Sequence, residues 1–203
     1  MHGVHRDLYR PRYGGIYGKE AEEMKKFELT SETKVVFGRT LYRIKALVKF
    51  GDVNAGDLGG WIEAEKNLSQ SGNAWVYGDA RVYGDAEVSG NAEVSGNAWV
   101  YGDAEVSGNA EVYGNARVYG NAEVCKIGAV FWIGAIGSRN RTTTFFRCKD
   151  GKIYVSCGCF FGNLEEFAVK VKQTHGDNEH GRVYMLAIEM AKARIVEEKN
   201  EVH

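Results

Sequence analysis

The side chains best suited to chemistry lie in the last third of the chain. They are the thiols of Cys157 and Cys159 and the imidazoles of His175 and His180. Such groups bind zinc, and a thiolate beside a base can act as a nucleophile. However, the C-x-C spacing differs from that of a zinc knuckle, and no base lies close to either cysteine in the sequence. We therefore predict no metal site, no cofactor and no catalytic residue.

The loop that precedes these residues is a candidate anion-binding site. Ser138, Arg139, Asn140 and Arg141 combine small polar groups with two guanidinium groups, which together can cradle a negative charge. The alternative is an ordinary connection between two structural units. An acyl- or nucleotidyl-transfer reaction would instead need a pocket that contains His175, because the central part of the chain has no histidine.

That central part consists of nine consecutive hexapeptides. They run from Ser71 to Val124 and follow the rule [YS]-G-[ND]-A-x-V. A period of six is too short for helical repeats and is typical of a parallel β-helix, in which each repeat supplies one short strand and a corner. The repeats therefore predict the architecture that must position any functional side chain.

The hexapeptide resembles the repeat of left-handed β-helix proteins, the fold of many acyltransferases. In that repeat an aliphatic residue is followed four positions later by a small one, as Val76 is by Ala80. The resemblance covers about residues 55–136 and implies coils of three hexapeptides, so that residues one coil apart stack about 4.8 Å from each other. It does not imply the reaction, because one fold hosts many functions and these coils carry neither an insertion nor a histidine.

Stacking of the coils predicts ladders of outward-pointing side chains, of which one is aromatic. We define the aromatic face by its six residues: Arg81, Trp99, Arg117, Tyr83, Tyr101 and Tyr119. A Trp between two Arg gives cation–π contacts worth about 0.5–1 kcal/mol each. We expect this face to be a subunit interface. The alternatives are a carbohydrate platform, a base-stacking surface, or a ladder that only stabilises the stacked strands.

A second ladder is acidic and consists of Glu87, Glu105 and Glu123. Carboxylates stacked at this spacing repel each other by about 1 kcal/mol in water. The ladder is interpreted as a solvated edge, with a cation site, a basic partner or nucleic-acid mimicry as alternatives.

The flanking segments predict four regions. Residues 1–23 are expected to be a disordered leader before a natural start at Met24, and 24–54 a β-hairpin cap. The β-helix is expected over 55–136, with 125–130 and 131–136 as degraded repeats. Residues 137–203 are expected to form a ββαα unit. In that unit, Asn163 resembles the N-cap of a helix running to about His175, and a second helix runs from about Glu179 to Glu198.

Composition gives no sign of a membrane or nucleic-acid protein. The 203 residues include 26 Lys and Arg and 27 Asp and Glu, for a net charge of −1. No apolar run approaches the roughly 20 residues of a membrane span, and the N-terminus lacks a signal-peptide core. The four cysteines form no disulfide framework. We expect a cytoplasmic protein, located in the host cytoplasm if a phage encodes it.

A wider resemblance covers about residues 24–196. The segments LYRIKALVKFGDVNAGDLGGWIEAE, CGCFFGNLEEF and HGDNEH are similar to hexapeptide-repeat proteins of bacteria, phages and prophages. This implies a mobile-element setting. We therefore predict a non-catalytic phage-type binding or scaffold protein that forms a homo-oligomer, a dimer or a trimer, through the aromatic face. The alternatives are a phage inhibitor that binds a host defence protein or its nucleotide signal, and a hexapeptide-type acyltransferase.

Overall fold

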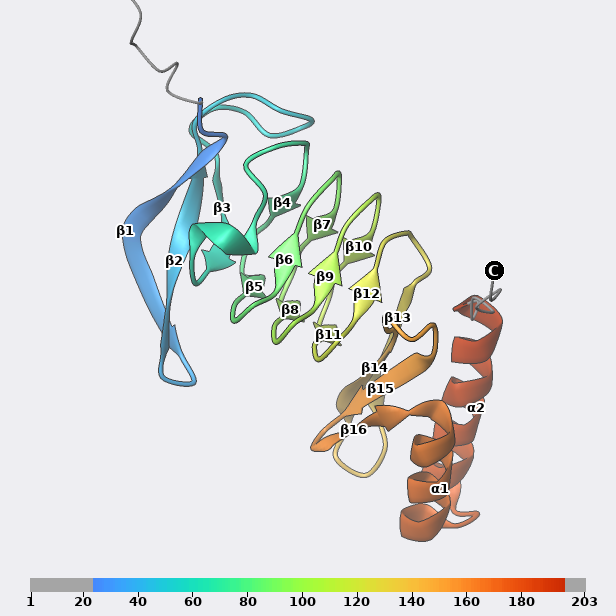
Figure 1. Ribbon diagram of the computed structural model, residues 1–203. Helices are drawn as coiled ribbons and strands as arrows, with labels where there is room; N and C mark the ends of the chain where they lie inside the picture. The colour runs from blue at the N-terminus through green and yellow to red at the C-terminus, as the bar shows by residue number, and fades with distance from the viewer. Residues whose placement is uncertain (1–23, 196–203) are drawn as a thin grey trace, which may run out of the picture.

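The computed structural model describes residues 24–195 and shows a mainly β protein built from three successive parts (Figure 1). Antiparallel strands at the N-terminal side lead into a parallel β-solenoid, and a second antiparallel sheet with two helices follows. The predicted leader, residues 1–23, lies outside the described residues. None of the helices within residues 24–195 is long and apolar enough to cross a membrane.

The solenoid confirms the predicted β-helix of hexapeptide repeats. Its strands have two residues each: β4 (Trp75–Val76), β5 (Arg81–Val82), β6 (Glu87–Val88), β7 (Glu93–Val94), β8 (Trp99–Val100), β9 (Glu105–Val106), β10 (Glu111–Val112), β11 (Arg117–Val118) and β12 (Glu123–Val124). They pair in parallel along three faces, in the orders β4-β7-β10, β5-β8-β11 and β6-β9-β12. Arg81 pairs with Trp99 and Trp99 with Arg117, so the register is the one that the repeat predicts.

Each position of the hexapeptide has one structural role. The Ala and Val of every repeat fill the interior and are at most 1% exposed. The glycines turn the corners: Gly90 has a φ of 68°, and a Cβ there would lie 2.9 Å from the backbone nitrogen of Gly108. At one corner the asparagines form a ladder, in which Asn73 donates to Asn91 over 3.1 Å and Asn91 donates to Asn109 over 3.1 Å. Within the repeats the interior is therefore filled by Ala and Val side chains.

The N-terminal cap continues one face of the solenoid. β1 (Phe27–Val36) and β2 (Arg39–Ala46) form a hairpin, and β3 (Leu58–Ile62) pairs antiparallel with β2 and parallel with β5. Cap and face thus make one sheet in the order β1-β2-β3-β5-β8-β11. A short 3-10 helix, η1 (Glu65–Asn67), follows β3. Gly59 lets the chain approach the first coil, because a Cβ there would lie 2.6 Å from the carbonyl oxygen of Val76.

The cap also satisfies backbone carbonyls that the solenoid leaves open at its first coil. Within the coils, the backbone N–H of each x residue donates to the Ala carbonyl of the next coil, as Trp75 does to Ala92 over 3.0 Å. The first coil has no preceding coil to donate to its own Ala carbonyls. Three groups of the cap donate to these carbonyl oxygens instead. Lys26 Nζ donates to that of Ala74 over 2.9 Å, the backbone N–H of Trp61 to that of Ala80 over 3.0 Å, and Asn67 Nδ2 to that of Ala86 over 2.8 Å.

The C-terminal unit is larger than the sequence predicted. Its sheet has four strands in chain order, β13 (Val130–Ile136), β14 (Arg141–Arg147), β15 (Ile153–Cys157) and β16 (Phe160–Asn163), and all neighbours are antiparallel. Residues 131–136 were expected to be a degraded repeat and instead belong to β13. The reason is that Trp132 stands where the repeat has its corner glycine, so the chain runs straight and pairs with β14.

Two helices cover one face of this sheet, as predicted. They are α1 (Leu164–His175) and α2 (Glu179–Arg194), which ends before the expected Glu198. The capping box at Asn163 is confirmed, because its Oδ1 accepts from the Glu166 N–H over 2.9 Å and its N–H donates to Glu166 Oε2 over 3.0 Å. The opposite face of the sheet supplies Phe146 and Cys148 to the solenoid core.

Candidate functional site

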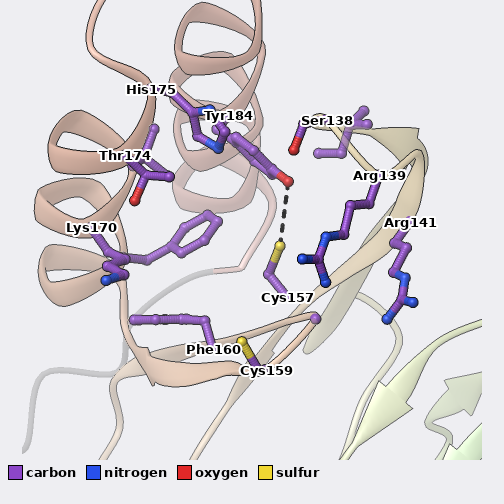
Figure 2. A pocket seen from close by; sticks show the side chains of 14 residues that line it. Ser138, Arg139, Arg141, Cys157, Cys159, Phe160, Lys170, Thr174, His175 and Tyr184 are labelled. Carbon is purple, nitrogen blue, oxygen red and sulfur yellow. Dashed lines mark hydrogen bonds between the residues drawn. The ribbon is translucent and has the colours of Figure 1, made fainter.

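A pocket opens within the C-terminal unit, between the sheet and α1 (Figure 2). We call it the C-terminal pocket; its volume is about 200 Å³. The β13–β14 loop supplies Ser138, Arg139 and Arg141, and the β15–β16 turn supplies Cys157 and Cys159. The helices complete the wall with Phe167, Lys170, Thr174, His175 and Tyr184. The site thus combines residues from the β13–β14 loop, the β15–β16 turn and both helices.

A directed chain of hydrogen bonds lies at one side of this pocket. Thr143 Oγ1 donates to Cys157 Sγ over 3.2 Å, and the Cys157 thiol donates to Tyr184 Oη over 3.5 Å (Figure 2). Burial, with the Cys157 contact as a smaller cause, raises the pKa of Tyr184 above its ordinary value. Tyr184 therefore keeps its proton. Because the Tyr184 oxygen acts as an acceptor toward Cys157, the hydroxyl proton of Tyr184 is available to a ligand.

The backbone fixes Tyr184 in this position. Gly137 has a φ of 73°, and a Cβ on it would collide with the Tyr184 hydroxyl. The Tyr184 ring also packs edge-on against Phe167, with centroids 5.5 Å apart. The hydroxyl is thus held between the β13–β14 loop and the β15–β16 turn.

His175 is the last residue of α1 and is partly buried beside Tyr184. The two ring centroids lie 5.7 Å apart, and the ring of His180 lies 5.7 Å from that of His175 on its other side. His175 lines the pocket and His180 does not. Histidine is the residue type that most often acts as a general acid or base, so the pocket contains a group suited to acid–base chemistry.

The predicted anion-binding loop is divided between two cavities. Ser138, Arg139 and Arg141 line the C-terminal pocket, whereas Asn140 and Arg141 line a second concavity beside it. Within residues 24–195, no carboxylate lies within ion-pair distance of Arg139 or Arg141. Both charges are therefore open to an anionic ligand.

The aromatic face has the predicted ladder geometry. The guanidinium groups of Arg81 and Arg117 lie 4.8 and 5.0 Å from the ring centre of Trp99. Tyr101 stacks on Tyr83 with centroids 5.0 Å apart and on Tyr119 with centroids 4.6 Å apart. The rings and guanidinium groups therefore pack on one another along the solenoid axis.

Both ends of this face are covered by the flanking parts. Tyr83 is only 6% exposed and packs in one cluster with Leu41 and Trp61 of the cap. At the other end, the ring of Phe161 in β16 lies 4.7 Å from that of Tyr119. At the hairpin tip, Phe37 meets Trp99 with centroids 5.5 Å apart and is still 79% exposed.

The acidic ladder is in register, with Glu87 paired to Glu105 and Glu105 to Glu123. Lys149 of the C-terminal unit donates to Glu105 over 2.6 Å, and this hydrogen bond raises the pKa of Lys149. One rung is therefore neutralised within the molecule. Over the described range, no group of three or more His, Cys, Asp or Glu side chains is arranged to hold a metal ion. The cysteines and histidines considered for zinc therefore form no such group within that range.

Comparisons with known proteins find likeness in the repeats. Residues 110–125 match a family model described as YdcK beta solenoid repeat. The chain is a hexapeptide-repeat β-helix protein. A relative in Escherichia coli (strain K12), named uncharacterized acetyltransferase YdcK, is 51% identical over 37 residues. That stretch covers 18% of this chain and 11% of the relative.

The prediction of a non-catalytic protein is contradicted by this likeness to a protein named as an acetyltransferase. The sequence argument for it looked for a histidine on the coils. The structure instead places His175 in a pocket outside the coils, in the C-terminal unit. The sequence analysis had made acyl transfer depend on a pocket that contains His175, and the structure has a pocket with this residue in its lining.

Sequence reasoning also missed Tyr184 and Cys157 as pocket residues. Tyr184 is buried on α2 and also lines the pocket at the edge of that core. Cys157 is the last residue of β15 and is partly buried. The one local signal was the loop at residues 137–141, whose arginines mark the pocket entrance.

Proposed function

We propose that the C-terminal pocket is the active site of an acyltransferase. The observation that carries this proposal is the pocket lining, where His175 lies beside the Tyr184 ring and the same pocket is lined by Ser138 and Arg139 of the basic loop. The partial likeness to a protein named as an acetyltransferase supports the same class of reaction. A volume of about 200 Å³ suits a short acyl group such as acetyl better than a long chain.

In this proposal His175 is the general base. It takes the proton from an acceptor hydroxyl or amine, whose oxygen or nitrogen attacks the carbonyl carbon of an acyl thioester. A bond forms between acceptor and acyl group, the acyl–sulfur bond breaks, and the thiolate leaves with the electron pair. His175 then returns its proton to that thiolate.

Tyr184 supplies the hydrogen bond to the carbonyl oxygen, on which negative charge develops during attack. Its oxygen accepts from Cys157, and Cys157 in turn accepts from Thr143, so the phenolic proton is directed at the ligand. Because burial raises the pKa of Tyr184, the phenol remains a donor at neutral pH. Arg139 holds an anionic part of the ligand at the entrance.

The test compares His175→Ala with His180→Ala. Thiol release from acetyl-coenzyme A is measured with amine, amino-sugar and hydroxyl acceptors, and donor binding is measured by calorimetry. We expect His175→Ala to lower the rate by about 10²–10⁴-fold and His180→Ala to have little effect. Equal rates in wild type and His175→Ala, or no binding of the donor by wild type, would refute the proposal.

We also propose that the protein forms a homo-oligomer through the aromatic face, at its cap end. The observation that favours this is the hairpin tip, where Val35 and Phe37 are 71% and 79% exposed and Phe37 lies against Trp99. Apolar side chains gathered at such a tip are typical of an interface.

Val35→Lys with Phe37→Asp tests this interface without disturbing the packed rungs, because both side chains are exposed. Light scattering after size exclusion should then show monomers, and Leu47→Lys, a 40% exposed position elsewhere in the cap, serves as the control. An unchanged assembly would contradict the interface. Co-purification of a nucleotide or host protein with the wild type would favour the inhibitor alternative instead.

A further inference from the structure

A second concavity, which we call the junction pocket, lies where the last rung of the aromatic face meets the C-terminal sheet. It has a volume of about 410 Å³ and is lined by Asn115, Arg117, Asn140, Arg141, Thr142 and Ser156. It shares Arg141 and Gly158 with the C-terminal pocket, so the two cavities adjoin. Of the residues in the described range 24–195, neither the acidic ladder nor any other carboxylate contributes to its lining.

The lining chemistry is that of an anion site. Two guanidinium groups supply positive charge, two side-chain amides supply N–H donors, and two hydroxyls supply O–H donors. Among the described residues, no carboxylate is within ion-pair distance of Arg117 or Arg141. A fork of N–H donors matches the oxygens of a phosphate group in pairs, which makes arginine the preferred residue for phosphate recognition.

The site is also held in place before any ligand arrives. The Arg117 guanidinium rests on the Trp99 ring, 5.0 Å from its centre. The backbone N–H of Arg117 donates to Thr144 Oγ1 over 3.0 Å. This hydrogen bond links β11 to β14, and so joins the two walls of the pocket. Ser156 is buried at the base, at 5% exposed. The contact with Trp99 thus reduces the side-chain entropy that Arg117 loses on binding.

We propose that the junction pocket binds the phosphate group of a phosphate ester. The cavity is larger than one phosphate group needs, so it also holds part of the group to which the phosphate is attached. Because Arg141 and Gly158 belong to both cavities, the rest of that ligand reaches the C-terminal pocket. This last step rests on the proposed acyl-transfer function, whereas phosphate binding does not.

The test begins with inorganic phosphate as the probe, titrated into the full chain and followed by ¹H–¹⁵N NMR. Arg117→Gln and Arg141→Gln should each weaken binding by about tenfold or more, since each removes charged hydrogen bonds. Arg81→Gln is the matched control, because Arg81 stacks on the same Trp99 ring, at 4.8 Å, but does not line the pocket. Wild-type affinity in Arg117→Gln and Arg141→Gln, or no saturable shift in wild type, would overturn the proposal.

Kinetics then identify which ligand carries the phosphate. If the acyl donor does, Arg117→Gln raises KM for acetyl-coenzyme A but not for S-acetylpantetheine, which has no phosphate. If the acceptor does, the variant raises KM for a phosphorylated acceptor and not for its unphosphorylated form. Arg117-dependent phosphate binding that persists while His175→Ala leaves turnover unchanged would exclude His175 as the catalytic base and leave the phosphate site standing.

Discussion

The sharpest stability prediction concerns Lys26, the buried lysine that closes the first coil. Its side chain is 4% exposed, and its Nζ lies 2.9 Å from the carbonyl oxygen of Ala74, 3.4 Å from that of Ser71 and 3.5 Å from that of Gly72. The same amine lies 5.0 Å from the ring centre of Phe50. Burial lowers the pKa of Lys26 from 10.5 to about 8.

This shift links the stability of the fold to pH. The unfolded chain holds the Lys26 proton up to pH 10.5, whereas the folded chain releases it from about pH 8. Between these values the unfolded state binds more protons, so the stability of the wild type rises with pH. One unit of pKa corresponds to about 1.36 kcal/mol, which sets an upper bound of about 3 kcal/mol for the whole window.

The experiment is urea unfolding of wild type and Lys26→Met at several pH values between about 8 and 10.5, the window that the shift defines. The difference in unfolding free energy should grow in favour of wild type as pH rises. Ionising tyrosines affect both proteins alike and cancel in this difference. Asn67→Leu is the control, because Asn67 caps Ala86 in the same way without titrating. A difference between wild type and Lys26→Met that stays constant with pH would refute the reasoning.

Three further predictions concern the C-terminal unit. Tyr184→Phe should lower kcat for acyl transfer by about 10²–10³-fold while circular dichroism stays unchanged, because one donor to the developing oxyanion is lost. Gly137→Ala should cost about 1–3 kcal/mol in thermal unfolding, owing to its φ of 73° and the collision with Tyr184, whereas Gly134→Ala, with no atom closer than 3.9 Å, should cost far less. Burial raises the pKa of the Cys148 thiol to about 12, so native alkylation followed by mass spectrometry should modify exposed Cys159 and reach Cys148 only on unfolding.

The solenoid could be predicted because its rule is local. Each hexapeptide contains the residues of its own strand, corner and interior. The register between strands of successive coils follows once the number of residues in a coil is known. The ends of the solenoid follow no such rule. Nothing in the period shows that Lys26 and Asn67 replace a missing coil, since they lie 48 and 19 residues from the carbonyls they cap. Trp132 shows the same limit: its effect depends on β14, which the repeat does not encode.

The candidate site was only partly predictable for a related reason. The basic loop could be recognised because Ser138, Arg139 and Arg141 are neighbours in sequence. Tyr184 and Cys157 are 27 residues apart, and the packing of α2 against the β15–β16 turn brings them together. Their residue types fit a buried core equally well, so only the hydrogen bond between them shows that they face a pocket.

The place of both pockets follows from the geometry of the repeats. Along a face, groups such as Tyr83, Tyr101 and Tyr119 stack at 5.0 and 4.6 Å, so each rung covers the next and the same chemistry recurs along the axis. A site for one small ligand needs different groups that converge on one point, and a ladder spreads its groups out instead. Arg117 differs because its sheet ends at β11, and no further rung covers it. Its guanidinium is left beside Arg141 of the next unit, so the ladder contributes to a binding site at the point where it ends.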